Sequence, residues 1–170
     1  MLDQLIKLVE KNAGDAIINN QAVPNQHNNA AIQEVASQIF SSLKGQVSQG
    51  NLQQVVSLFQ GSNVQQALTS NPMVTQMIST IAANFASKFG VSPTAAKSIV
   101  QGLVPAVMNQ LVSKTNNPND QDFDLTDMMR NMSGNNKLDV GSILGQLSGG
   151  KSNNPMGGIG DMLGGFLGKK

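Results

Sequence analysis

The chain has 170 residues, a net charge of +1, and no cysteine, tryptophan or tyrosine. Asn and Gln together number 36, against 21 charged residues, and His27 is the single histidine. These totals suit one domain plus a tail, exclude disulfides and thiolate chemistry, and leave few groups for acid–base catalysis, so we expect no enzyme activity, no cofactor and no metal.

The N-terminal segment is predicted to be an amphipathic helix. Apolar residues recur there at the spacing of one helix face: Leu2, Leu5, Ile6, Val9, Ala13 and Ile17. Charged residues from Asp3 to Lys11 interrupt the apolar run, so the segment does not resemble a signal peptide. No stretch approaches the roughly 18 apolar residues of a membrane span, and we expect a cytoplasmic protein.

Two further helices are predicted before residue 71. A loop over residues 19–29 contains Pro24, a cluster of amides and a solvated His27. The next helix fades near residues 45–50, and its inward residues are Ile32, Val35, Ala36, Ile39, Phe40 and Leu43. Asn51 is predicted to cap a short helix that ends at Gly61. Its inward residues are Leu52, Val55, Val56 and Phe59, and another short turn is expected near Asn63.

The clearest helix signals lie between residues 71 and 111. Asn71-Pro72 is a typical start, Gly90 a typical stop, and Ser92-Pro93 a second start. The first of these helices faces inward with Val74, Met77, Ile78, Ile81, Phe85 and Phe89. Pro105 lacks the amide hydrogen that a continuous helix uses. We therefore predict a kink or break over residues 102–104, followed by a last helix with Val107, Met108 and Leu111.

The sequence changes character after residue 115. Residues 116–120 are typical of a linker, and Asp124 is predicted to cap a short helix with Leu125, Met128, Met129 and Met132. We predict an all-α protein, a multi-helix bundle or array with a flexible glycine-rich C-terminal tail. The expected division is a helical domain over residues 1–115, a linker with a short helix over 116–137, and a glycine-rich tail with a short helix over 138–170.

One stretch resembles a known family. Residues Phe89–Leu111, FGVSPTAAKSIVQGLVPAVMNQL, combine a glycine turn, a Ser-Pro helix start and an aliphatic helix interrupted by proline. Together with the Gly- and Leu-rich tail, they resemble the YidB-like family of small bacterial proteins of unknown function. The likeness covers roughly half the chain and rests on packing and turn signatures. It implies a bacterial helical protein and offers no catalytic residue.

Two motifs resemble ligand-binding loops. Gly145–Ser152, GQLSGGKS, matches the phosphate-loop pattern, which needs a strand before it and a helix after it. A capped helix is predicted before it and Asn-Asn-Pro follows it, so nucleotide binding is not favoured. Asp120, Asp122 and Asp124 have the spacing of a calcium loop, but Leu125 stands where that loop needs glycine. A capped helix start explains these aspartates better.

Residues 81–103 have the spacing of a helix-turn-helix. In that interpretation Ser92, Thr94 and Lys97 would contact DNA. Proteins that bind DNA draw much of their affinity from several phosphate contacts, and here only Lys97 and Lys88 are basic. A DNA-associated regulator is therefore the alternative hypothesis, and a helix corner packed in a bundle is preferred.

The predicted function is that of a non-enzymatic structural or interaction protein, which self-associates through apolar helix faces and its tail. A sparsely charged surface and an apolar tail favour it. Met128, Met129 and Met132 could form an adaptable contact surface, although methionines more often fill a core. The candidate contact residues of the tail are Met162, Leu163, Phe166 and Leu167. The expected partner is a second copy or another protein, giving a homo-oligomer, and neither nucleic acid nor a membrane surface is favoured.

Overall fold

The computed structural model describes residues 2–60, 68, 70–117, 119–120, 123 and 125–133. Every regular element among them is helical, which confirms the all-α prediction. They belong to one compact unit, Met1–Leu138. No helix in this part of the chain has both the length and the apolar character needed to cross a membrane. The predicted turn near Asn63, the GQLSGGKS segment and the four contact residues of the tail lie outside the described residues.

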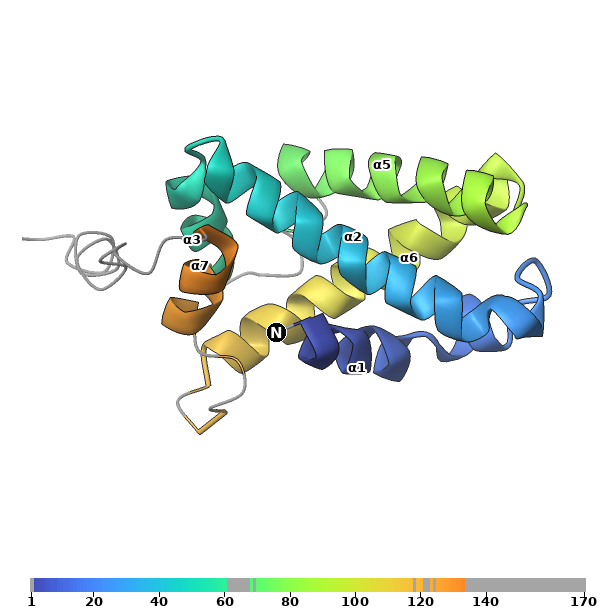
Figure 1. Ribbon diagram of the computed structural model, residues 1–170, viewed down its shortest axis with the longest axis horizontal. Coiled ribbons are helices and arrows are strands. Elements are labelled where there is room, and N and C mark those ends of the chain that lie inside the picture. The colour runs from blue at the N-terminus through green and yellow to red at the C-terminus, as the bar shows by residue number, and fades with distance from the viewer. Residues whose placement is uncertain are drawn as a thin grey trace, which may run out of the picture. The chain divides into compact units, whose positions relative to one another are not determined.

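Four longer helices form the body of this unit (Figure 1). Helix α2 (Asn28–Ser48) packs against α1 (Leu2–Asn12) and against α5 (Pro72–Phe89). Helix α6 (Pro93–Thr115) packs against α1 and, most extensively, against α5. Two short helices, α3 (Leu52–Gln60) and α7 (Leu125–Ser133), also pack on α2. The central helix α2 therefore links elements from both ends of the described chain.

The first helical stretch ends in a π-helical turn, η1 (Gly14–Ile18). The amide of Ile18 donates to the carbonyl of Ala13, five residues back, at 3.0 Å. Ala13 and Ile17 are both fully buried, and η1 packs against α6 and α2. The wider turn thus extends the buried face beyond the end of α1.

The buried face of α1 differs slightly from the prediction. Leu5 and Val9 are buried as expected, and Leu8, which the predicted stripe omitted, is buried with them. Leu2 and Ile6 lie at the edge of this face and are exposed and partly exposed. A stripe at i, i+3 and i+4 from Leu5 accounts for this placement, because α2 and α6 cover α1 on that side.

Helix α2 begins earlier than predicted. The expected loop over residues 19–29 already turns helical at η2 (Asn25–His27), and α2 follows from Asn28. The ring of His27 lies 6.0 Å from the ring of Phe89, centroid to centroid, and His27 is only partly exposed. The prediction of a solvated histidine therefore holds only in part, because Phe89 at the C-terminal end of α5 lies beside the ring.

Helix α2 ends within the range predicted for it, residues 45–50. It continues through Gly45 to Ser48, with Val47 buried. Asn51 stands directly before α3, as predicted, and its carbonyl accepts from the amide of Val55 at 3.1 Å. Its side chain donates instead to Gln46 Oε1, at 2.8 Å, so it ties α3 to the end of α2.

Helices α5 and α6 start where the sequence predicts. The Asn71 Oδ1 atom accepts from the amide of Met73 at 2.9 Å, with proline at the first helical position. Gly90 ends α5 in the left-handed conformation, at φ +66°. Ser92 Oγ then accepts from the amide of Ala95 at 3.3 Å and caps α6. These local caps fix the corner between the two helices.

Helix α6 is continuous, so of the predicted kink or break over residues 102–104 the break is wrong, as is the separate last helix, and the kink stays a prediction. Pro105 lies inside the helix and is partly exposed, next to exposed Gln101 and Gly102. A proline in a helix interior costs about 3 kcal/mol. Each buried aliphatic side chain contributes about 1.5–3 kcal/mol. Buried residues stand on both sides of the proline and offset its cost: Ile99, Val100, Leu103, Val104, Val107, Met108, Leu111 and Val112.

The core is aliphatic, as the composition predicts. Phe59 and Phe85 are its largest fully buried side chains, and no polar or charged residue among those described is buried. Three residues predicted to face inward are only partly buried: Phe40, Leu52 and Ile78. Carboxamides join helices at the edge of the core, since Gln110 Nε2 donates to Asn12 Oδ1 at 3.0 Å and Asn116 Nδ2 donates to the Phe59 carbonyl at 2.7 Å.

Helix α7 is part of this core. Met128, Met129 and Met132 are fully buried, and α7 packs on α2. The methionines therefore fill the core and do not form an open contact surface, which corrects that hypothesis. The residues before α7 are tied as well, because Lys114 Nζ binds Asp120 Oδ2 at 2.5 Å. The short helix expected within a linker is thus packed into the compact unit.

Candidate functional site

A polar seam runs along the solvent side of the contact between α2 and α5. The helices are antiparallel, because hydrogen bonds join Glu34 to Lys88 and Gln38 to Asn84. Amides, hydroxyls and one ion pair make up most of the seam. This α2/α5 seam consists of Glu34, Gln38, Ser41 and Gly45 of α2 and Gln49 directly after it, with Met73, Gln76, Thr80, Asn84 and Lys88 of α5.

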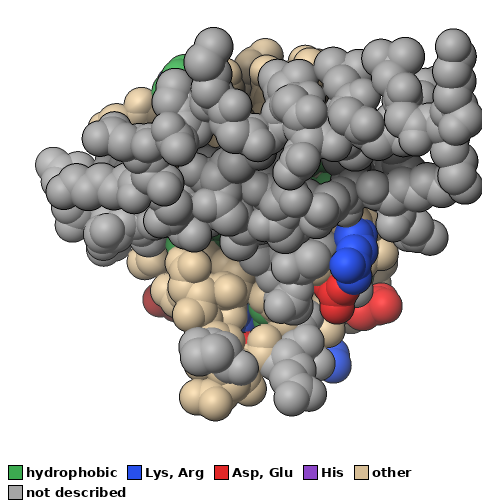
Figure 2. Space-filling view, turned by 90° about the vertical axis from the view of Figure 1, so that its left-hand side faces the viewer, with side chains coloured by type: hydrophobic (Ala, Val, Ile, Leu, Met, Phe, Trp, Pro, Cys, Tyr) green, Lys and Arg blue, Asp and Glu red, His purple; other side chains and the backbone are tan. Residues whose placement is uncertain are grey.

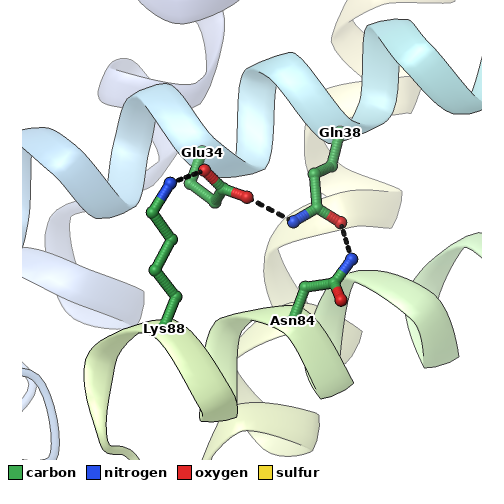
Figure 3. Close-up of polar contacts among 4 residues, drawn as sticks. All are labelled: Glu34, Gln38, Asn84 and Lys88. Carbon is green, nitrogen blue, oxygen red and sulfur yellow. Dashed lines mark hydrogen bonds and ion pairs between the residues drawn. The ribbon is translucent and has the colours of Figure 1, made fainter.

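At one end of the α2/α5 seam, four side chains form a continuous series of hydrogen bonds (Figure 3). Lys88 Nζ donates to Glu34 Oε2. Gln38 Nε2 donates to Glu34 Oε1 at 2.6 Å and accepts, through Oε1, from Asn84 Nδ2 at 2.8 Å. The hydrogen bond from Lys88, assisted by that from Gln38, lowers the pKa of Glu34 although partial burial acts in the opposite direction. The carboxylate therefore stays ionised and holds both helices.

At the other end of the α2/α5 seam lies an open hollow of about 240 Å³. We call it the methionine hollow. Its lining is three hydroxyls, three carboxamides, two thioethers and one glycine: Ser41, Ser42, Thr80, Gln46, Gln49, Gln76, Met73, Met77 and Gly45. A Cβ on Gly45 would meet nothing within 4 Å, so the glycine leaves space there. The lining carries no charge, and its chemistry suits an uncharged group that accepts hydrogen bonds.

A second hollow, of about 310 Å³, lies where α1 meets α2. Leu2, Ile6 and Ala30 supply its apolar lining, and the Glu34–Lys88 pair borders it. Leu2 is 37% exposed and, with Ile18 at 40%, is one of two large apolar residues that stay exposed on the described surface. We call this hollow the Leu2 notch.

The residues predicted to contact DNA lie at the start of α6. Thr94 and Lys97 are exposed, and Ser92 is exposed with its hydroxyl engaged in capping the helix. Lys88, the other basic residue of this corner, is paired with Glu34. Of the two lysines at this corner, Lys97 is the one without an acidic partner among the described residues.

Charges are few on the described surface. Helices α2, α3, α5 and α6 carry only five charged residues: Glu34, Lys44, Lys88, Lys97 and Lys114. On the face drawn in Figure 2, basic and acidic side chains lie next to each other at the right-hand edge. No group of three or more acidic or histidine side chains that could hold a metal ion occurs in this part of the chain.

The sequence motifs did not single out the α2/α5 seam. Its partners Glu34 and Lys88 stand 54 residues apart, and no local pattern specifies that they meet. One signal was available in the sequence. The solvent-facing positions of α5 are almost all hydroxyl, amide or alanine, with Lys88 as the single charged residue of that helix.

The fold and this surface define a class of protein: a small α-helical protein with a closed aliphatic core and a polar, weakly charged exterior. Residues 71–170 match the family described as bacterial protein of unknown function (DUF937), and the chain belongs to this YidB-like family. The resemblance seen in Phe89–Leu111 is thereby confirmed. The match starts at the cap of α5 and leaves out α1, α2 and α3. No curated protein and no solved structure matches the chain.

Proposed function

We propose that the protein is a non-enzymatic interaction protein that self-associates, with the solvent side of α5 and the C-terminal tail as contact regions. One observation carries the proposal: α5 presents hydroxyls and amides along its exposed side, with Lys88 as its single charge. Copies of such a surface meet little electrostatic repulsion. Hydroxyls and carboxamides both donate and accept, so this surface can also form hydrogen bonds with a second copy of itself.

The helix faces contribute less apolar area to this association than the sequence suggested. Their apolar stripes are buried in the core. The large apolar residues that stay exposed on the described surface are Leu2, in the Leu2 notch, and Ile18. The tail supplies apolar side chains instead, at Met162, Leu163, Phe166 and Leu167. The proposal therefore combines a polar contact through α5 with an apolar contact through the tail.

Sedimentation velocity over a series of concentrations tests self-association. We expect the full chain to sediment faster as its concentration rises. A truncation after Leu138 keeps α7 and its buried methionines, and it should associate more weakly than the full chain. A full chain that stays monomeric at the highest concentration contradicts the proposal.

A pair of charge variants tests the α5 surface. Thr80→Glu with Ala83→Glu adds two like charges to the exposed side of α5 and should weaken association. Ser98→Glu with Gln101→Glu places the same charges at the same spacing on the exposed side of α6 and serves as the control. Equal association by both variants rules out the α5 contact while leaving the tail contact open to the truncation test.

The alternative function, a DNA-associated regulator that uses residues 81–103, has less support. Its favourable feature is the exposure of Thr94 and Lys97 at the start of α6. The pairing of Lys88 with Glu34 weakens it, because DNA phosphates need unpaired basic groups. A gel shift at low salt that Lys97→Glu abolishes would favour this alternative, and no binding at low salt would reject it.

A further inference from the structure

Methionine is the main oxidisable residue of this protein. The chain has nine methionines and no cysteine, tryptophan or tyrosine. Peroxides convert a methionine thioether to a sulfoxide where they can reach the sulfur, and reductases can reverse this step. Accessibility of each sulfur to solvent therefore decides where oxidation begins.

The structure separates its six described methionines into two groups. Met73 and Met77 line the methionine hollow, with 8% and 3% of their surface exposed. The other four are closed off, with 0% or 1% exposed: Met108, Met128, Met129 and Met132. We therefore expect a peroxide to reach the first group through the hollow, whereas the second group needs the core to open first.

We propose that the methionine hollow is an oxidative modification site, with Met73 as its primary target and Met77 as the second. The sulfur lone pair attacks one oxygen of hydrogen peroxide, the O–O bond breaks and an S–O bond forms. The departing hydroxide takes the proton from the transferred oxygen and leaves as water. The sulfur is oxidised by two electrons, and the peroxide is reduced by two.

The lining of the methionine hollow can accommodate the product. A sulfoxide replaces a weak acceptor with a strong one, and a sulfoxide in a closed apolar core would lack partners. Here side chains with hydroxyls and carboxamides able to donate line the same hollow as Met73 and Met77, among them Ser42, Gln49 and Thr80. Oxidation should therefore make the lining of the hollow more polar without unfolding the core.

Peptide mass spectrometry on the full chain tests the proposal. The protein is treated with hydrogen peroxide, quenched at intervals, and digested with trypsin. Cleavage at Lys44, Lys88, Lys97 and Lys114 separates the peptide with Met73 and Met77 from the one with Met108. We expect Met73 to oxidise at least about tenfold faster than Met108 in the native protein. In denaturant all six rates should converge. Native rates for Met73 within twofold of Met108 would overturn the proposal.

A matched pair of variants tests the route of access. Gly45 and Gly102 both lie in helices, and a Cβ on either would meet nothing within 4 Å. Gly45→Leu projects a side chain into the methionine hollow and should slow oxidation of Met73 several-fold. Gly102→Leu makes the same change on α6 and should leave that rate unchanged. If Gly45→Leu protects Met73 no better than Gly102→Leu does, the hollow is not the route and the proposal fails.

Discussion

Replacing Gly102 by alanine tests the continuity of α6. Gly102 lies in the helix three residues before Pro105, its φ is not positive, and a Cβ there would meet nothing within 4 Å. A helical glycine costs about 0.5–1 kcal/mol relative to alanine. We therefore expect Gly102→Ala to raise the free energy of unfolding by about 0.5–1 kcal/mol. For a folded unit of this size, the melting temperature should rise by about 2–4 °C.

Gly90 provides the matched control. It ends α5 at φ +66°, where an alanine side chain costs about 1–2 kcal/mol. Gly90→Ala should therefore lower the free energy of unfolding, although the chemical change is the same as in Gly102→Ala. Urea unfolding followed by circular dichroism measures both variants. If Gly102→Ala destabilises the protein as much as Gly90→Ala does, α6 is not a regular helix at residue 102 and the reasoning is wrong.

Asn71→Ala removes the acceptor that caps α5 and should lower the free energy of unfolding by about 1 kcal/mol in urea titrations. Asn71→Asp keeps an acceptor at the cap and should therefore retain most of that stability. Met128→Ala should cost about 2–5 kcal/mol by the same assay, and a cost no larger than that of the exposed control Asn131→Ala would contradict the burial of α7. Glu34 has a lowered pKa in the folded state, so the stability it gains from Lys88 is complete above the ordinary glutamate pKa of about 4.3 and is lost as the pH falls through the lowered value. Because Lys88 is mostly exposed, Glu34→Gln should lower the free energy of unfolding by less than about 1 kcal/mol at neutral pH and should not change it in strong acid. If the variant and the unchanged protein differ more in free energy of unfolding as the pH falls, this reasoning is refuted.

The sequence was most informative where structure depends on near neighbours. The caps at Asn71 and Ser92 and the stop at Gly90 each involve bonds or angles within a few residues. Those chemical preferences act regardless of the rest of the fold. The prediction for α5 was therefore confirmed at both ends.

The failed predictions involve contacts that are distant in sequence. The local penalty of Pro105 suggested a kink or a break, and burial against α5 and α1 keeps α6 from breaking. Whether Met128 faces a partner or the core depends on α2, which a methionine pattern does not reveal. The α2/α5 seam could not be foreseen for the same reason, because the register between Gln38 and Asn84 arises only when the helices pack.

The carboxamide bonds between helices have one more consequence. Gln38 with Asn84, Gln110 with Asn12, and Asn116 with the carbonyl of Phe59 join separate elements without any ionised group. Mobile ions screen charges but leave neutral dipoles in direct contact almost untouched. The helices should thus keep the same arrangement in dilute buffer and in strong brine.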